Sequence, residues 1–219
     1  IAVTNLHNPT GVRLGPDELS ALNDLAREKD LYVLVDEVYL DFIFDEGTPK
    51  RAFHYGDRLI STGSTTKVFG LSEPRCGWIV GSAEVISACQ KAHWMGMSKP
   101  ARPLMCLHLA ILKRWDALIQ KAREDWQRQH AYVTTWLAKE KRVRYVQPDG
   151  GLTYFTLLPE GLDSWALMEH CRDKYSTLLV PGKFFNDSRG IRISFGGHES
   201  KLVPALENFS KGLDDLLEA

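Results

Sequence analysis

Short apolar runs separated by one amphipathic stretch make up the first 81 residues. Strands are predicted at residues 1–4, 31–35, 58–63 and 76–81, where apolar and β-branched side chains follow one another. After the first run, Pro16 stands at a favourable first helical position, and leucines then recur at helical spacing. Because the 31–35 run is apolar throughout, it is typical of a parallel strand that is covered on both faces. Strand, helix and strand in this order favour an α/β layered sheet.

From residue 101 the pattern turns helical for some forty residues. The apolar stripe of this stretch predicts core packing and consists of Leu104, Leu107, Ile111, Trp115, Leu118 and Ile119. Strands and helices then mix, with strands expected near 143–146, 152–158, 177–180 and 191–195 and helices over 164–173 and from Ser200. An αβ mixture after a long helix favours a second, smaller domain, joined to the first by that helix.

Composition limits the classes of function. The 219 residues are 44% hydrophobic and 25% charged, which is the balance of a globular protein able to bury a core. A net charge of -1 gives no basic field for nucleic acid. The chain has no run of about 18 apolar residues, so no membrane span is predicted. The four cysteines lack metal or disulfide spacing, so we expect a cytoplasmic setting and no metal site.

A polar loop after the third predicted strand carries the most informative motif. Ser64 stands three residues before Lys67, and Arg75 follows eight residues after it. Taken singly, each of these residues is usual on a solvated surface. A phosphate-binding loop of the type G-x-x-x-x-G-K-S/T is excluded, because Thr66 precedes the lysine and Val68 follows it.

Three further motifs follow strand ends or lie on a late strand. Asp36 and Tyr39 belong to Asp-Glu-Val-Tyr, Asn8 begins Asn-Pro-Thr-Gly, and Arg192 lies in Arg-Ile-Ser. In α/β sheets, ligands bind at the carboxyl ends of the strands. Alone, Asp36 could cap its strand, Tyr39 could be packing, and Asn-Pro-Thr-Gly could be a turn. Glu37, between the aspartate and the tyrosine, is expected to be structural.

In this order and at these spacings, the four motifs resemble the aminotransferase class I/II family of fold type I enzymes, which depend on pyridoxal 5′-phosphate. The resemblance covers the whole chain and departs from the family pattern at Leu6, where Pro is common. It implies an α/β fold: part of a mostly parallel large-domain sheet with flanking helices, plus a C-terminal α+β small domain. We place the large domain at residues 1–115 and the small one at 116–219, which includes part of the bridging helix.

The resemblance implies a cofactor role for five residues. Lys67 would form a Schiff base with pyridoxal phosphate and act as the catalytic acid–base group. Ser64 and Arg75 would hold the 5′-phosphate. Asp36 would pair with the pyridine nitrogen and favour its protonated form. Tyr39 would donate a hydrogen bond to the ring O3′.

Two residues would face the substrate as well. Asn8 would bond the same O3′ and contact the substrate, and Arg192 would grip the substrate α-carboxylate with a planar, bidentate guanidinium. The implied substrates are an amino acid and a 2-keto acid. A homodimer in the full-length protein is implied by the family and by no residue of this chain.

Other reactions on the same scaffold stay open. A C–S lyase or a decarboxylase would share this residue set, and a pyridoxal-phosphate-binding regulatory domain would bind ligand without turnover. The substrate side chain is not specified. Trp94, Met95, Met97 and Arg102 are expected in a loop that could contribute to specificity, with loop packing as the simpler role.

The chain opens on a strand-like segment and not on Met. We therefore expect a longer parent protein. The family keeps a phosphate-binding helix turn, an aromatic residue that stacks on the cofactor and a closing N-terminal segment further upstream. The chain by itself should therefore bind cofactor weakly and catalyse little, whereas the parent protein should be an active enzyme.

Overall fold

The structure is a computed structural model that describes residues 1–44, 49–96 and 101–218. The chain divides into two compact units. Unit 1 consists of Ile1–His7, Val12–Arg123 and Asp149–Gly151, and unit 2 consists of Asn8–Gly11, Glu124–Pro148 and Leu152–Ala219. The helix α5 (Trp115–Lys139) supplies residues to both units. The division between residues 115 and 116 stays our proposal for the domain boundary.

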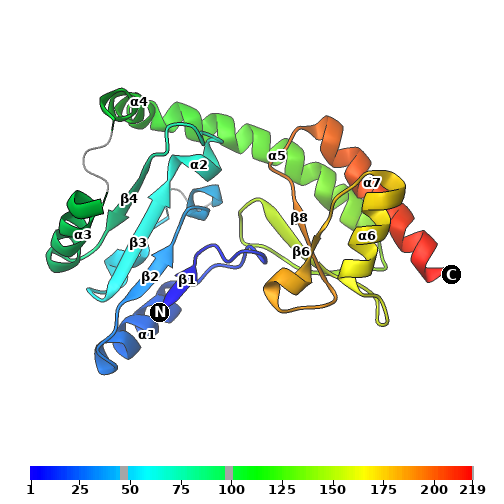
Figure 1. Ribbon diagram of the computed structural model, residues 1–219, viewed down its shortest axis with the longest axis horizontal. Helices are drawn as coiled ribbons and strands as arrows, with labels where there is room; N and C mark the ends of the chain where they lie inside the picture. The colour runs from blue at the N-terminus through cyan, green and yellow to red at the C-terminus, as the bar shows by residue number, and fades with distance from the viewer. Residues whose placement is uncertain (45–48, 97–100, 219) are drawn as a thin grey trace. The chain divides into compact units, whose positions relative to one another are not determined.

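Unit 1 is built on a four-stranded sheet with the order β1-β2-β3-β4 (Figure 1). Its strands are β1 (Ala2–Thr4), β2 (Val33–Asp36), β3 (Leu59–Ser64) and β4 (Gly77–Val80). The first three strands run parallel, and β4 pairs antiparallel with β3. Each of the four predicted strands is therefore confirmed within two residues, and so is the α/β class.

The helix α1 (Pro16–Glu28) begins at the predicted proline. Gly15 caps it, and the Glu18 carboxylate accepts a hydrogen bond from the Gly15 amide at 3.0 Å. An acidic side chain in the first turn also suits the helix dipole. The helix packs on one face of the sheet through a cluster of six buried residues: Leu19, Ala26, Val33, Val35, Ala52 and Leu59. The short helix η2 (Ala52–Tyr55) closes this cluster.

The expectation that residues 31–35 are covered on both faces is wrong. Leu34 is 40% exposed, because its side chain points to the face opposite the buried Val33 and Val35. Ile79 on β4 is 48% exposed. The continuous apolar run indicates that side chains on both faces of the strand favour burial. The described residues bury only the face that carries Val33 and Val35.

The helical stretch after residue 101 is two helices, α4 (Arg102–Leu112) and α5, which follow α3 (Ala83–Gly96). The prediction of core packing along this stretch is correct at Ile111, which is 6% exposed, and wrong at Leu104 and Leu107, which are 38% and 46% exposed. Among the described residues of α4, Ile111 is the buried one. Farther along the stripe, Trp115, Leu118 and Ile119 are half-buried, so the start of the stripe is its most exposed part.

Unit 2 contains a second four-stranded sheet with the order β5-β6-β8-β7, in which every pairing is antiparallel (Figure 1). Its strands are β5 (Arg144–Val146), β6 (Thr153–Leu157), β7 (Val180–Pro181) and β8 (Gly190–Ser194). The helices α6 (Ser164–Tyr175) and α7 (Glu199–Leu217) pack with the end of α5 around a core of fourteen buried residues, Phe209 and Leu213 among them.

One predicted strand of unit 2 starts later than expected. The segment 177–180 is strand only from Val180. Ser176 adopts a left-handed conformation with φ of 51°, and the Thr177 amide donates to the Cys171 carbonyl at 3.1 Å. The residues directly after α6 therefore form the C-terminal cap of that helix and cannot yet pair as a strand.

No helix within the described ranges is long and apolar enough to cross a membrane.

Candidate cofactor and substrate site

Asp36 is the last residue of β2 and is half-buried. In the sheet it lies opposite Thr4 on one side and Thr62 on the other. Its Oδ1 accepts a hydrogen bond from the Val38 amide at 3.2 Å, which turns the chain away from the strand. The carboxylate thus stands at the carboxyl end of a parallel strand, where α/β sheets bind their ligands.

Lys67 and Tyr39 are neighbours in unit 1. Lys67 is exposed and lies on α2 (Thr65–Val68), which directly follows β3. Its Nζ atom lies 5.6 Å from the centroid of the Tyr39 ring, within the range of a cation–π contact. This contact brings together two motifs that are 28 residues apart in the sequence, Asp-Glu-Val-Tyr and Ser-Thr-Thr-Lys.

Ser64 ends β3 and caps α2. Its Oγ accepts a hydrogen bond from the Thr66 amide at 3.0 Å and lies 3.1 Å from the Cys76 carbonyl oxygen. In the sheet, Ser64 pairs with Gly77, so Arg75 lies two residues before its partner. Arg75 is exposed and has a φ of 50°. A hydroxyl, an amine and a guanidinium thus come from the two adjoining ends of the β3–β4 pair.

The close approach of β3 and β4 depends on Gly63. A Cβ at this position would lie 2.4 Å from carbon atoms of the Trp78 indole, which packs against the bare backbone. The indole in turn contacts Trp115 edge to face at 5.9 Å. The glycine therefore fixes the strand immediately before the Ser64 cap.

Glu37 has the structural role expected of it. It is fully buried, and its Oε1 accepts a hydrogen bond from the Ala52 amide at 2.7 Å. Arg51 donates to the Glu37 carbonyl and pairs with Asp41 at 2.5 Å. Burial raises the pKa of the Glu37 carboxyl above its ordinary value, while the Ala52 hydrogen bond opposes the shift.

In unit 2, Arg192 and Asn8 are in direct contact. Arg192 lies on β8, and its Nη1 donates a hydrogen bond to Asn8 Oδ1 at 3.1 Å. The Thr153 hydroxyl donates to the Pro9 carbonyl at 2.9 Å and ties the Asn-Pro-Thr-Gly segment to β6. The Arg192 Nε atom is buried, and no described residue accepts a hydrogen bond from it. An arginine donor held in this way is suited to an acceptor supplied by a ligand.

The predicted site residues therefore fall into two groups. Unit 1 carries Asp36, Tyr39, Ser64, Lys67 and Arg75, and unit 2 carries Asn8 and Arg192. The aromatic ring beneath the Arg192 guanidinium, Phe185 at 5.3 Å, was not singled out from the sequence.

The expectation that Trp94, Met95 and Arg102 lie in a loop is wrong. Trp94 and Met95 lie on α3, and Arg102 is the first residue of α4. Met97 lies outside the described residues. Trp94 and Met95 are 66% and 90% exposed, so neither packs in a loop as expected.

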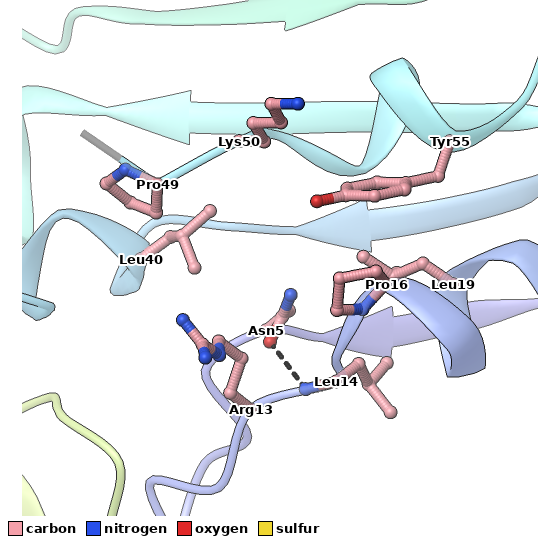
Figure 2. Close-up of a pocket in the computed structure, with 9 residues that line it drawn as sticks. All are labelled: Asn5, Arg13, Leu14, Pro16, Leu19, Leu40, Pro49, Lys50 and Tyr55. Atoms are coloured by element: carbon pink, nitrogen blue, oxygen red, sulfur yellow. Dashed lines mark hydrogen bonds between the residues drawn. The ribbon is translucent and has the colours of Figure 1, made fainter. Parts of the chain in front are cut away.

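A separate cavity of about 300 Å³ lies at the start of α1 in unit 1 (Figure 2). None of its described lining residues belongs to the predicted site; they are Asn5, Arg13, Leu14, Pro16, Leu19, Leu40, Pro49, Lys50 and Tyr55. Across its wall, Asn5 Oδ1 accepts a hydrogen bond from the Leu14 amide at 3.0 Å (Figure 2). Asn5 thus supports the loop that enters the helix.

The donor set matches the chemistry of pyridoxal phosphate. An amine (Lys67) suits its aldehyde, a carboxylate (Asp36) its pyridine nitrogen, a phenol (Tyr39) its ring oxygen, and a hydroxyl and a guanidinium (Ser64 and Arg75) its phosphate. Within residues 1–44, 49–96 and 101–218, no group of three or more His, Cys, Asp or Glu side chains could hold a metal ion.

The sequence model of the family described as aminotransferase class I and II matches residues 1–209. The chain belongs to this family. The family is a class of aminotransferases that depend on pyridoxal phosphate, so the family resemblance and the cofactor predicted from the motifs are confirmed.

Curated aminotransferases cover the chain almost completely. It is 23% identical to an aspartate aminotransferase of Pyrococcus horikoshii over 98% of its length, and 27% identical to the arginine–pyruvate transaminase AruH of Pseudomonas aeruginosa over 90%. The match takes up 56% of the first protein and 51% of the second. The chain thus spans about half the length of the curated relatives it matches.

Solved structures of aminotransferases share the fold. A PLP-dependent aminotransferase from Streptococcus suis superimposes with a TM-score of 0.90 at 24% identity, covering 98% of this chain and 57% of that one. LysN, an α-aminoadipate aminotransferase from Thermus thermophilus in complex with N-(5′-phosphopyridoxyl)-L-leucine, gives 0.86 at 22% identity and covers 99% and 58%. The predicted fold class of the aminotransferase family is thereby confirmed.

Proposed function

We propose that the protein to which this chain belongs is a pyridoxal-phosphate-dependent aminotransferase that moves an amino group between an amino acid and a 2-keto acid. Membership of the family supports this proposal. The observation that carries it is the position of the Lys67 amine. Lys67 lies on the helix that Ser64 caps, and its amine is 5.6 Å from the centroid of the Tyr39 ring. Covalent capture of this cofactor requires an accessible amine, and a hydroxyl and a guanidinium nearby in the chain would suit its phosphate.

The residues of unit 1 would hold and tune the cofactor. When bound, pyridoxal phosphate would attach covalently to Lys67 and draw electrons from the substrate Cα, which acidifies the Cα–H bond. The substrate amino group would take the place of Lys67 on the cofactor, and the Lys67 amine released in this way would move a proton between Cα and the cofactor C4′. Asp36 would keep the pyridine nitrogen protonated, and Tyr39 would donate to the ring oxygen. Ser64 and Arg75 would bind the phosphate.

The residues of unit 2 would orient the substrate. Arg192 presents a planar guanidinium to which Asn8 is already bonded at 3.1 Å. We propose that Arg192 binds the α-carboxylate shared by amino acids and 2-keto acids, and that Asn8 contacts both the substrate and the cofactor ring oxygen. A shared carboxylate handle would let one site accept both reactants in turn.

A second candidate is elimination or decarboxylation on the same residue set. One relative keeps a reaction other than transamination open, since a protein 26% identical over 97% of this chain is named a capreomycidine synthase, from Streptomyces vinaceus, and not an aminotransferase. The two chemistries differ in their need for an acceptor. Release of pyruvate and ammonia from an amino acid without any added 2-keto acid would favour elimination, and carbon dioxide release would favour decarboxylation.

The proposal is tested by the absorption spectrum and the turnover of the complete protein with pyridoxal phosphate, beside Lys67→Ala. We expect a cofactor band near the visible that disappears in Lys67→Ala, and a loss of kcat of at least about 10²-fold, the contribution typical of an acid–base group. Lys91→Ala on the exposed face of α3 is the matched control and should leave both unchanged. A Lys67→Ala protein that keeps the band would contradict the assignment.

The same spectra test the 219-residue chain alone. We expect a weak band or none, because the chain spans about half the length of its relatives. A chain that forms the band as readily as the complete protein and transaminates at a similar rate would show that the described residues suffice.

A further inference from the structure

The guanidinium of Arg192 is held by more than its hydrogen bond. Arg192 lies on the central strand β8, between Phe155 of β6 and Val180 of β7. Its Nη1 is bonded to Asn8, and its guanidinium carbon lies 5.3 Å from the centroid of the Phe185 ring. At that distance the ring face attracts the cation, and this contact favours one placement of a long side chain.

Phe185 is itself fixed by a chain of contacts that reaches the backbone of β8. It ends the short helix η3 (Gly182–Phe185) and meets the buried Phe155 ring edge to face, at 5.9 Å and 84°. Phe155 in turn packs on Gly190, where a Cβ would lie 2.1 Å from a ring carbon. The series Gly190, Phe155, Phe185 and Arg192 is therefore contiguous and leaves little room for adjustment.

The loop that carries Phe185 is equally constrained. The Asp187 amide donates to the Gly182 carbonyl at 3.0 Å, and the Gly190 amide donates to Asp187 Oδ1 at 3.1 Å. Gly182 has no space for a side chain, since a Cβ would lie 2.4 Å from the Asp187 carbonyl oxygen. The turn between β7 and β8 thus places the ring without help from a ligand.

The burial of Phe185 argues against a simple core role. The ring is only half-buried and is not part of the buried cluster of unit 2. Its neighbour Phe184 is 67% exposed and contacts Trp165 of α6. The two adjacent phenylalanines therefore have different partners: Phe185 contacts Arg192, and Phe184 contacts Trp165.

We propose that Phe185 is a positioning residue for Arg192, and that its ring and the Asn8 amide oxygen together hold the guanidinium ready for a carboxylate. The Arg192 Nε–H is buried without an acceptor among the described residues, so the arrangement leaves a donor for a planar, bidentate ligand. This inference deepens the proposed function, on which its substrate side rests. It assigns affinity for the carboxylate, and not proton transfer, to the ring.

The first test needs no catalysis. The exchange of the Arg192 Nε–H with water is followed by NMR in the ¹⁵N-labelled chain, and the signal is assigned by its loss in Arg192→Lys. We expect Phe185→Leu to speed the exchange several-fold, because the ring no longer shields and holds the guanidinium. Phe185→Tyr, which keeps the ring, should restore slow exchange, and Phe184→Leu should not change it. Unchanged exchange in Phe185→Leu would overturn the proposal.

The second test uses the complete protein with its cofactor. Propionate, a bare carboxylate, is titrated while the same resonance is followed, and KM and kcat are measured for an amino acid and a 2-keto acid. Phe185→Leu should weaken propionate binding and raise both KM values about threefold to fivefold, as expected for one cation–π contact, while kcat changes less. Phe185→Tyr should behave like the parent. Equal affinities and KM values in Phe185→Leu would overturn the proposal.

The propionate titration also separates the two proposals. If the complete protein binds propionate at Arg192 but transfers no amino group, the proposed function fails, while the comparison of Phe185→Leu with Phe184→Leu still decides the role of the ring. Circular dichroism of each variant shows whether the protein is folded. A Phe185→Leu protein that is unfolded while Phe184→Leu is folded would assign the ring to stability and overturn the positioning role.

Discussion

The two units differ in how completely their sheets are covered. The antiparallel sheet of unit 2 packs with three helices around fourteen buried residues. The mostly parallel sheet of unit 1 packs with α1 in a cluster of six buried residues, while its other face exposes Leu34 and Ile79. A parallel sheet is normally covered on both faces, whereas an antiparallel one is stable with a single covered face. We therefore expect unit 2 to be the better stabilised part of the chain.

A matched pair of leucine substitutions would test this difference most strongly. Leu167 on α6 is fully buried in the core of unit 2, and Leu34 on β2 is 40% exposed. We expect Leu167→Ala to lower the free energy of unfolding by about 2–5 kcal/mol, and Leu34→Ala to change it by less than about 1 kcal/mol. Urea unfolding followed by circular dichroism measures both. Equal costs would mean that the two sheets are equally well packed.

A glycine pair probes the packed side of unit 1. Gly63→Ala would push a methyl group into the Trp78 indole and should cost about 1–3 kcal/mol of unfolding free energy. Gly96→Ala is the control, since open space surrounds that position at the end of α3, and an alanine favours the helix. In thermal unfolding, Gly63→Ala should lower the midpoint temperature and Gly96→Ala should raise it. A harmless Gly63→Ala would show that β3 and β4 can separate.

Acid should weaken unit 2 through one histidine. His130 stacks on Trp126, and its Nε2 lies 2.8 Å from the Tyr154 hydroxyl. Burial lowers the pKa of His130 below its ordinary 6.5 and raises the pKa of Tyr154 to about 12. The unfolded chain therefore binds a proton before the folded one does, so this contribution to stability is complete above pH 6.5 and is lost as pH falls through the lowered folded pKa.

The pH effect has a control in each unit. His130→Gln keeps an acceptor for Tyr154 but cannot titrate, so it should flatten the acid-side loss of protection in amide exchange of β6. Glu37 in unit 1 acts in the opposite direction, because burial raises its pKa from 4.5 and disfavours the charged form. Its contribution to stability is therefore lost as pH rises from 4.5 through the raised folded pKa. Glu37→Gln should remove that dependence from β3. An acid response that persists in His130→Gln would assign it to other groups.

The local part of the site could be predicted from the sequence. The three-residue spacing of Ser64 and Lys67 predicted that they lie in one loop, and the acidic residue after an apolar run predicted Asp36 at a strand end. Both predictions depend only on neighbours in the chain. The contact between Asn8 and Arg192 joins residues 184 positions apart, and no local pattern indicates it. The ring of Phe185 escaped notice for the same reason, because its partner comes from another strand.

The errors in the fold have a common physical origin. Apolar periodicity records that a side chain favours burial, but it does not say which segment will cover it. Leu34, Leu104 and Leu107 carry the pattern of buried residues and are nevertheless 40%, 38% and 46% exposed. By contrast, Pro16 was placed correctly at the start of α1, because a helix start is determined by its own first turn.

The allocation of the segment Asn8–Gly11 has a consequence for the order in which the protein is made. These four residues belong to unit 2, while the residues on both sides of them belong to unit 1. During synthesis Asn8 emerges 184 residues before Arg192, which at about 5–20 residues per second is a wait of roughly 10–40 seconds. Synthesis must therefore reach Arg192 before the contact between Asn8 and Arg192 in unit 2 can form.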